Sequence, residues 1–390
     1  MKYIPYSDIT KYYSLLNKEL VFYTIIIILP IFRKTIFNVA VDAGTYSGGL
    51  NQSTSLALLS VGVTFFIFLS RYKEIIMVCR KVLPLLLYYI FCLLSFIYSE
   101  QKFAIIFKAT EVLSSIVLTS YIIHKIKNVK LCLSYILLIC LLPMTIEFIY
   151  AGGRFIHTNT YSFSALLGLL ICIGGIRYNI FRWKEVGIFI IIFILGIIGG
   201  TSSATYISTI VGILTYFVCN KKGVKIEQIV LVCIIAFLIY YLYSDLILKY
   251  VFYGKSMGAV EGGTGRFGAW TIYMERFKES PIWGYGFLVG ERMASTKFGI
   301  EIPLISAHNS FISVLIGTGS IGMIFFLLFL IKWFYKLYTK AVNRNVFGLI
   351  LLPVFIAFII NTNSFPAIGS DWNYVGLALY AIYAFTQTKM

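Results

Sequence analysis

The sequence has few charged residues and lacks the common motifs of soluble enzymes. Only 13% of its 390 residues are charged, whereas about a quarter are charged in an average soluble domain. It contains no HExxH or Asp-x-Asp pattern for a metal activator and no Walker or Rossmann glycine pattern for a nucleotide. CxxC is absent too, and we interpret the seven cysteines as apolar packing residues. The sequence therefore predicts neither a metal nor a cofactor.

What the sequence has in abundance is apolar runs, with 59% hydrophobic residues. Uncharged runs such as 20–32, 54–70 and 186–200 approach or reach membrane-spanning length, and they do not alternate as barrel strands do. We expect an all-α, polytopic transmembrane helical bundle of about twelve spans. The spans are expected at roughly 20–40, 54–70, 82–98, 103–123, 131–151, 160–176, 186–201, 203–219, 227–244, 308–332, 346–362 and 374–387.

The net charge of +17 indicates membrane topology and not nucleic-acid binding. With the N-terminus inside, 21 of the 33 basic residues fall in inner segments, as the positive-inside rule requires. Most of the others lie in one long outer loop. We therefore expect nine spans in 1–244, a large structured outer loop over 245–307, three spans in 308–390, and both termini in the cytoplasm. The first twenty residues do not resemble a cleavable signal peptide.

Three ionisable residues fall inside predicted spans. Lys108 and Glu111 are three residues apart, so we expect them to pair on one helix facing the bundle interior. Glu147 is placed near the outer end of its span. Such residues are candidates for function, although an ion pair with a structural role explains the first two equally simply.

The first candidate site outside the spans is Ala151–Tyr161. Arg154 follows two glycines and precedes His157 and Asn159. The glycines free backbone amides, and a guanidinium can bind phosphate through two hydrogen bonds. An arginine that reaches the lipid headgroups would have the same sequence, and both interpretations stay open.

The second candidate site is the glycine-rich stretch that begins at Gly262. Thr264 is expected to cap a helix that runs through Arg266 to about Lys278, and Pro281 should end it. A helix N-terminus beside an arginine suits an anion such as a diphosphate. An amphipathic surface helix is the alternative. Under either interpretation the helix is expected to lie flat in the interface with its apolar face against lipid or the bundle. This face consists of Phe267, Trp270, Tyr273, Met274 and Phe277.

The third candidate site is Ser306–Ser310, at the mouth of the tenth predicted span. His308 would lie at a helix N-terminus, whose positive end should lower the imidazole pKa and keep the ring neutral. A neutral imidazole can accept a proton from a sugar hydroxyl. A helix-capping or interfacial histidine is the alternative. Further along, Gly317, Gly319 and Gly322 should allow close helix approach.

Together these motifs resemble the O-antigen ligase and polymerase superfamily. The residues that carry the resemblance form two blocks. One is His308-Asn309, followed after nine intervening residues by Gly319-Ser320-Ile321-Gly322, and the other is Thr264-Gly265-Arg266 with Trp270 and Pro281-Ile282-Trp283-Gly284-Tyr285-Gly286. Two shorter blocks, Gly153-Arg154-Phe155 with Asn159 and Thr201-Ser202-Ser203, are similar to upstream motifs of the same superfamily. The main resemblance covers about 261–322, and the rest matches in layout.

The resemblance implies an inverting, metal-independent glycosyltransferase of GT-C-like architecture in the bacterial inner membrane, with a periplasmic active site. The donor would be an undecaprenyl-diphosphate-linked glycan. His308 would activate the acceptor hydroxyl, and Arg266, helped by Arg154, would hold the diphosphate. Many members have an arginine after the seventh span, where this chain has Ser202-Ser203-Ala204-Thr205. Arg154, Arg276 or Arg292 would then supply the second cation.

Supporting residues are expected around this centre. Trp270, Trp283 and Tyr285 suit stacking on sugars, and Asn309 and Asn159 belong to the same motifs. We expect a polymerase of lipid-linked repeat units for O-antigen or capsule, working with membrane lipid, a flippase and a chain-length regulator. A ligase that passes the glycan to lipid A–core is the alternative, and a lipid-glycan flippase or transporter is a third. The motifs do not specify the sugars, the linkage or the oligomeric state.

Overall fold

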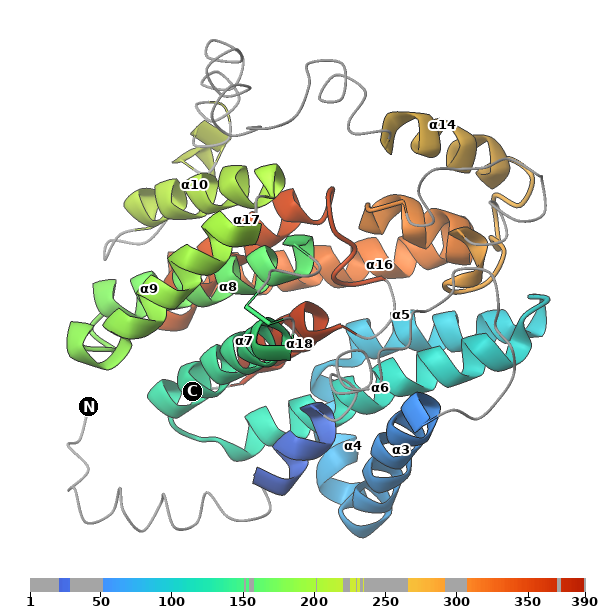
Figure 1. Ribbon diagram of the computed structural model, residues 1–390, viewed down its shortest axis with the longest axis horizontal. Coiled ribbons are helices and arrows are strands. Elements are labelled where there is room, and N and C mark those ends of the chain that lie inside the picture. Colours follow the sequence, from blue (N-terminus) through green and yellow to red (C-terminus); the bar gives the residue numbers. More distant parts are fainter. Residues whose placement is uncertain are drawn as a thin grey trace.

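A computed structural model describes residues 21–28, 52–150, 152–153, 158–200, 202–219, 225–228, 230–231, 234, 266–291, 307–369 and 373–388. Within these residues the chain is helical and has no strand (Figure 1). The elements are α3 (Gln52–Ser70), α4 (Tyr72–Lys81), α5 (Leu83–Leu94), η1 (Ser95–Ile97), α6 (Lys102–Lys125), α7 (Val129–Tyr150), α8 (Thr158–Arg177), α9 (Trp183–Gly200), α10 (Ser203–Val218), α14 (Arg266–Phe277), α16 (Ser310–Val342), α17 (Val346–Asn361) and α18 (Tyr374–Thr386).

The described helices confirm an all-helical bundle with several candidate membrane spans, but not the full number of predicted spans. By length and apolar composition, 5 of the described helices could cross a membrane, or up to 6 if the bent pair α4 and α5–η1 forms one span. The helices α10, α17 and α18 are apolar but shorter. The total of twelve spans stays a prediction, because most of 20–40 and of 227–244 lies outside the described residues. The stretches 245–265 and 292–306 of the outer loop lie outside them too.

Two short helices occupy the centre of the bundle. All 13 residues of α18 are buried, and α17 is buried along most of its length. The helix α17 packs against α8, α10 and α16, and α18 packs against α6, α7 and α8. These neighbours shield both helices from lipid. A 16-residue helix such as α17 is about 24 Å long and therefore ends short of the ~30 Å depth of the hydrocarbon core.

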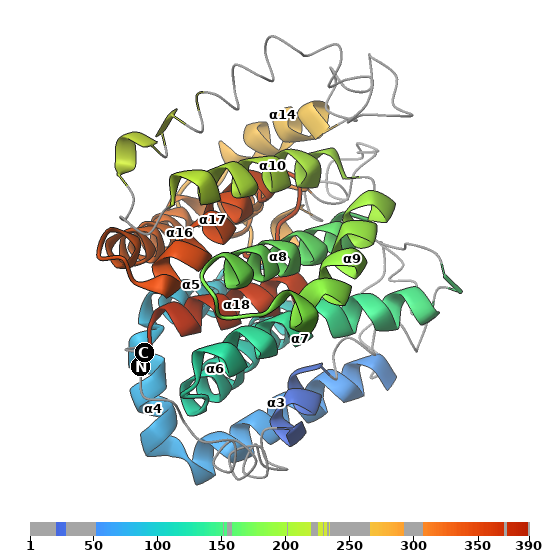
Figure 2. The same cartoon turned by 90° about the vertical axis from the view of Figure 1, so that its left-hand side faces the viewer.

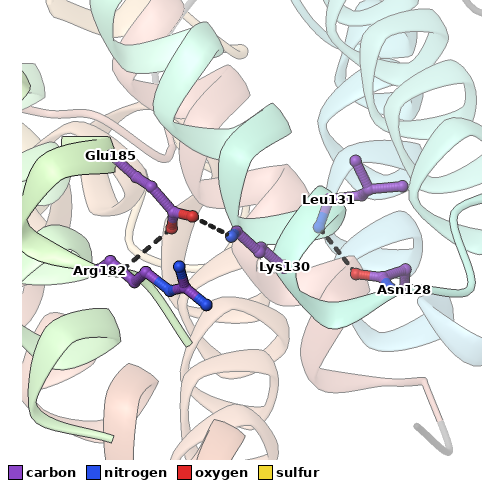
Figure 3. Close-up of polar contacts among 5 residues, drawn as sticks. All are labelled: Asn128, Lys130, Leu131, Arg182 and Glu185. Carbon is purple, nitrogen blue, oxygen red and sulfur yellow. Dashed lines mark hydrogen bonds and ion pairs between the residues drawn. The ribbon is translucent and has the colours of Figure 1, made fainter. Parts of the chain in front are cut away.

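One end of the bundle collects the basic loops. Lys130, at the start of α7, donates a 2.7 Å hydrogen bond to Glu185 of α9, whose carboxylate also accepts the Arg182 backbone N–H (Figure 3). At the same end, Lys340 of α16 donates to the Thr388 carbonyl oxygen after α18. All of these segments were predicted to face one side, and the structure places them together. We name this the basic end.

The intramembrane pair was predicted correctly. The Lys108 ammonium lies 3.6 Å from the Glu111 carboxylate, and both side chains are buried on α6. Glu147 is also buried, and its carboxylate accepts a 2.8 Å hydrogen bond from the Tyr374 hydroxyl at the start of α18. These acids are therefore neutralised or hydrogen-bonded inside the bundle.

The helix α16 is broken and folds back on itself. Gly319 has φ 64° and ψ −166°, which no helix contains. The rings of Phe311 and Phe326 lie 5.9 Å apart, whereas 15 residues of straight helix would separate them by about 22 Å. Residues 310–318 therefore form a re-entrant arm, and residues 320–342 form a long arm (Figure 1). The sequence had predicted one uninterrupted span over 308–332.

Residues 281–286, which we call the splice segment, provide hydrogen-bond partners for the backbone groups that the break in α16 releases. The backbone N–H groups of Tyr285 and Gly286 donate to the Ile316 and Gly317 carbonyl oxygens at 2.9 and 2.8 Å. In return, the N–H of Ser320 donates to the Pro281 carbonyl oxygen at 2.8 Å. Backbone groups left free inside a membrane cost several kcal/mol each. The motifs Pro281–Gly286 and Gly319–Gly322 therefore form one structural unit.

The splice predicts that Gly319→Ala destabilises the protein. A Cβ at Gly319 would lie 2.2 Å from the Ile282 carbonyl oxygen, and the positive φ adds strain. We expect a loss of at least about 2 kcal/mol of unfolding free energy. The matched control is Gly62→Ala on α3, where a Cβ meets nothing within 4 Å, and helix propensity predicts a gain of roughly 0.5–1 kcal/mol. Thermal unfolding in detergent measures both effects. Equal melting temperatures for the two variants would contradict the close packing of Gly319 against the splice segment.

Candidate functional site

The candidate site lies where α14 and the re-entrant arm begin. The two helices run side by side (Figure 1), and a small apolar cluster joins them. The buried members of this cluster are Ala269, Tyr273, Ala307, Ile312 and Ile316. At its inner end, the Trp270 indole N–H donates a 2.7 Å hydrogen bond to the Ala307 carbonyl oxygen. Of the predicted apolar face of α14, Tyr273 is buried in this cluster and Trp270 and Phe277 pack against it, whereas Met274 is exposed. The Phe267 side chain lies outside the described part of the structure.

Sequence reasoning placed this helix well. The predicted helix ran from Arg266 to about Lys278, and α14 extends over Arg266–Phe277. A turn follows, and the splice segment begins at Pro281. The expected cap Thr264 and the glycines around it lie outside the described residues. The first residue of the helix that the structure describes is Arg266, so the guanidinium stands at the positive end of α14.

His308 is fixed from both sides. The preceding residue, Ala307, is buried and held by Trp270, and the following residue, Asn309, caps α16. The Asn309 side-chain oxygen accepts hydrogen bonds from the Phe311 and Ile312 backbone N–H groups at 2.9 and 3.2 Å. His308 itself has φ 49°, in the left-handed region that a side chain of its size seldom adopts. Such strain persists only where the surroundings impose it.

Arg266 is an electrostatic neighbour of His308. Partial burial lowers the pKa of His308 below its usual value, and the positive charge of Arg266 lowers it further. The direction agrees with the expectation from sequence, but burial and Arg266 are the causes and not the helix end alone. Partial burial also lowers the pKa of Arg266, although a guanidinium stays charged at any physiological pH. The site thus holds a fixed cation beside a neutral imidazole.

His308 lies deeper than the predicted mouth of the span. Ser310, two residues on, donates its backbone N–H to the Thr362 carbonyl oxygen at 3.0 Å, at the end of α17. The length of α17 puts this point about 24 Å from the basic end, whereas the long arm puts Gly319 about 34 Å away. The re-entrant arm therefore carries His308 down into the bundle.

A chain of polar residues connects Ser310, two residues after His308, to the other two motif blocks. The Ser310 and Thr362 hydroxyls lie 2.8 Å apart. The Asn361 amide donates to the Thr205 hydroxyl at 3.0 Å, and that hydroxyl lies 3.3 Å from Ser162. The Ser162 hydroxyl in turn donates to the Asn159 carbonyl oxygen at 3.4 Å. Four segments that are far apart in the sequence thus meet at one level.

The meeting point gathers the N-terminal ends of helices. Thr205 lies in the first turn of α10, Asn159 and Ser162 lie in the first turns of α8, and Ser310 begins α16. Each of these ends carries a partial positive charge, although the first backbone N–H groups of α16 are already bonded to Thr362 and Asn309. Together with the charge of Arg266, which reaches His308, these helix ends make this level of the bundle favourable for an anion.

Sequence reasoning missed the connecting residues. Ser162, Thr205, Ser310, Asn361 and Thr362 are polar and largely buried, but each is also an ordinary residue at a helix end. The available signal was the clustering of polar residues at the boundaries of apolar runs, in Thr201–Thr205 and Asn361–Ser364. The same signal marks any span that ends in water. The sequence therefore did not distinguish a buried polar cluster from ordinary helix ends at the membrane surface.

Two predicted aromatic residues lie on different sides of the splice segment. Tyr285 packs against the cluster that joins α14 to the re-entrant arm, and its hydroxyl lies 2.8 Å from the Glu279 carboxylate. Burial, helped by Glu279, raises the pKa of Tyr285 to about 12. Trp283 instead stacks on Phe91 at 6.4 Å between ring centroids and contacts Tyr98. Their predicted roles in sugar binding stay predictions.

Of the three arginines proposed as a second cation, the structure describes only Arg276. Arg276 forms an ion pair with Glu279 one turn further along the chain, which leaves Arg276 less able to bind a substrate anion. Arg154 and Arg292 lie outside the described residues. In the position where the superfamily often has arginine, Ser202 and Ser203 are buried and Thr205 is part of the polar chain.

A shallow groove of about 500 Å³ runs along α14 beside the re-entrant arm. Trp270, Met274 and Ile312 provide apolar lining, and Thr271, Glu275 and Lys278 provide polar lining. In the part of the chain that the structure describes, no group of three or more His, Cys, Asp or Glu side chains is placed to hold a metal ion.

Comparison with known proteins supports the resemblance drawn from the motifs. Residues 187–327 match a family model described as O-antigen ligase. This range begins in α9, includes α14 and the splice segment, and ends in the long arm of α16. It therefore contains His308 and Arg266 together with the polar residues that start α10. No curated protein matches the chain.

The neighbourhood of His308 predicts a measurable titration. In a background with His124 and His157 replaced by glutamine, His308 is expected to titrate below its usual pKa near 6.5. Arg266→Gln removes the neighbouring positive charge, so the pKa of His308 should rise. The pH dependence of modification by diethyl pyrocarbonate, which attacks the neutral ring, reports the pKa. Lys278→Gln, on the exposed side of α14, is the control. An unchanged titration in Arg266→Gln would show that the two groups do not interact.

Proposed function

The chain carries an O-antigen ligase domain and belongs to the O-antigen ligase/polymerase superfamily, and on this premise we propose that it polymerises lipid-linked oligosaccharide repeat units. The growing chain would move from its undecaprenyl diphosphate to the terminal sugar of the next unit, giving O-antigen or capsular polysaccharide. The observation that carries the proposal is that His308 feels the positive charge of Arg266 and lies two residues before Ser310, where the starts of α8, α10 and α16 meet.

The donor diphosphate is proposed to bind at this convergence. Arg266 can make two parallel hydrogen bonds to phosphate oxygens, and the N-termini of α8, α10 and α16 supply further partial positive charge. Arg154, which precedes α8, is the best candidate for the second cation, because α8 begins at this level and Arg276 is paired with Glu279. In the transition state these groups would offset the charge that develops on the leaving diphosphate, with no metal ion required.

His308 is proposed to act as the general base. The imidazole removes the proton from the acceptor hydroxyl while the hydroxyl oxygen attacks the anomeric carbon of the donor sugar. The bond from that carbon to the diphosphate oxygen breaks on the opposite face, so the configuration inverts. The products are the elongated glycan on the acceptor lipid, undecaprenyl diphosphate, and a proton that leaves through His308.

The supporting residues are proposed to position the sugars and the base. Asn309 holds the turn that orients His308. Trp270 lines the groove beside this turn and offers an aromatic surface to a sugar ring. Asn159 lies on the first turn of α8, where a hydroxyl of the donor sugar could reach it. Trp283 and Tyr285, through the splice segment, are placed further towards the outer end.

The proposed setting is the bacterial inner membrane, with the site on its periplasmic side. The basic end gathers the loops that the positive-inside rule assigns to the cytoplasm, and the candidate site lies towards the other end. Both termini would then be cytoplasmic. A flippase would deliver the lipid-linked repeat unit to that side, and a chain-length regulator is a further proposed partner.

A ligase is the second candidate function. The description of the matching family, O-antigen ligase, favours it. A ligase would use the same donor and the same two residues, and would take lipid A–core as acceptor. A flippase is a weaker candidate, because it would need its cations along a central cavity, whereas α17 and α18 fill the centre of the described bundle with apolar side chains.

His308→Ala tests the function and separates the candidates. Loss of a general base is expected to lower the transfer rate by about 10²–10⁴-fold. In a polymerase, surface polysaccharide on a gel would then shorten to a single repeat unit on lipid A–core. In a ligase, bare core would remain while lipid-linked glycan accumulates. His124→Ala, at the basic end, is the control. A normal ladder from His308→Ala would end the assignment of His308 as the base.

Arg266→Ala and Arg276→Ala form a matched pair on one helix. Arg266→Ala should slow transfer by about 10²–10³-fold, as expected for loss of one donor that stabilises the transition state. Arg276→Ala breaks a partly exposed ion pair with Glu279. Such a pair is worth about 1 kcal/mol at most, hence a change of about fivefold or less. The assay follows glycan transfer in membranes that contain equal amounts of each variant. Equally mild effects would reduce Arg266 to a surface charge.

A further inference from the structure

The helix α4 lies across the basic end of the bundle instead of along it. It meets α5–η1 at an angle of 98°, and only Val82 separates the two helices. Figure 2 shows α4 at the bundle end where the C-terminus is marked. If α5 follows the membrane normal, α4 lies nearly in the membrane plane, at the level of the lipid headgroups.

The outer surface of α4 combines apolar and basic side chains. Its inner side, with Ile75 and Val78, is buried against α6. Tyr72 and Met77 are 49% and 47% exposed. Lys73 and Arg80 are also exposed, and around the helix axis they lie between Tyr72 and Met77. On the helix, these four positions fall within one arc of about 140°. This is the composition of a helix that inserts apolar side chains at a bilayer surface while its cations face headgroups.

Behind α4, further cations lie close together. The Lys81 ammonium is 3.1 Å from the His124 Nδ1 atom of α6. Lys336 of α16 is near enough to Lys81 for their charges to repel, and Lys340 is similarly placed beside Lys336. Lys81, Lys336 and Lys340, all partly exposed, thus form one group of cations at the basic end, and the repulsion between them opposes folding.

Carboxylates compensate few of these charges. Glu74 is bonded to Lys125. In the described part of the chain, the hydrogen-bond acceptors of Lys336 and Lys340 are neutral, namely the Gln387 side chain and the Thr388 carbonyl oxygen. An added anion at this place would therefore relieve repulsion among Lys81, Lys336 and Lys340.

We propose that the surface formed by α4, Lys81, Lys336 and Lys340 binds the headgroup of an anionic phospholipid. The headgroup phosphate would lie against Lys81 and Lys336, and the acyl chains would extend beside the exposed apolar residues of α4. The bend between α4 and α5 makes this possible, because it brings the exposed face of α4 to the level where the headgroups meet the acyl chains. The site is separate from His308 and does not depend on the proposed glycosyl transfer.

The experiment compares the full-length protein in nanodiscs of phosphatidylcholine alone and of phosphatidylcholine with phosphatidylglycerol. Phosphatidylglycerol should raise the melting temperature of the wild-type protein, and the rise should shrink in high salt. The double variant Lys81→Gln/Lys336→Gln should lose that rise. Native mass spectrometry should show phosphatidylglycerol retained on the wild type and lost from the double variant. Inorganic phosphate at equal ionic strength should not reproduce the effect if the acyl chains contribute.

Lys130→Gln is the matched control, because Lys130 lies at the same end but is paired with Glu185, and it should keep the full response. Lys73→Gln/Arg80→Gln changes only exposed residues, so a reduced response there supports the proposal even if the first double variant fails to fold. An equal response in the double variants and in Lys130→Gln would overturn it. So would a wild-type protein that does not respond to phosphatidylglycerol, or one that free phosphate stabilises equally.

Discussion

The exchange of backbone hydrogen bonds between the splice segment and the broken helix α16 is the constraint on which the candidate site depends. A helix inside a membrane can be interrupted only where other groups satisfy the backbone that it releases. Residues 281–286 do this at the Gly317–Ser320 break, with bonds in both directions. Because the break turns the re-entrant arm back towards α17, it decides where His308 lies. Because the splice segment directly follows α14, the same bonds fix the height of Arg266.

Glycine is required at this junction for a specific reason. A Cβ at Gly284 would lie 2.6 Å from the Ile316 carbonyl oxygen, and one at Gly319 would lie even closer to that of Ile282. Both residues have positive φ. The two segments approach so closely that only hydrogen fits between them. The glycine-rich motifs therefore have a structural role. They affect the candidate site indirectly, because they set the position of the re-entrant arm that follows His308.

The sequence predicted individual elements better than their arrangement. The helix from Arg266 and the Lys108–Glu111 pair follow from local patterns of capping and i,i+3 spacing, and the structure confirms both. Apolar runs likewise located α5–α10, α17 and α18. The re-entrant arm was missed because its residues are as apolar as those of an ordinary span, and hydropathy carries no information on direction. The polar chain through Thr205 and Asn361 depends on which helices are neighbours, and no single stretch of sequence specifies that.

If His308 is the base of the proposed glycosyl transfer, its closeness to Arg266 has a consequence for the timing of that reaction. Burial lowers the pKa of His308, and the guanidinium charge of Arg266 lowers it further, so the imidazole is a weak base. An anion that binds the guanidinium cancels that charge, and an imidazole beside a neutralised arginine is a stronger base. The base would then gain strength only when a donor is present. Such an enzyme would deprotonate hydroxyls, including water, poorly until the glycan that needs a nucleophile has arrived.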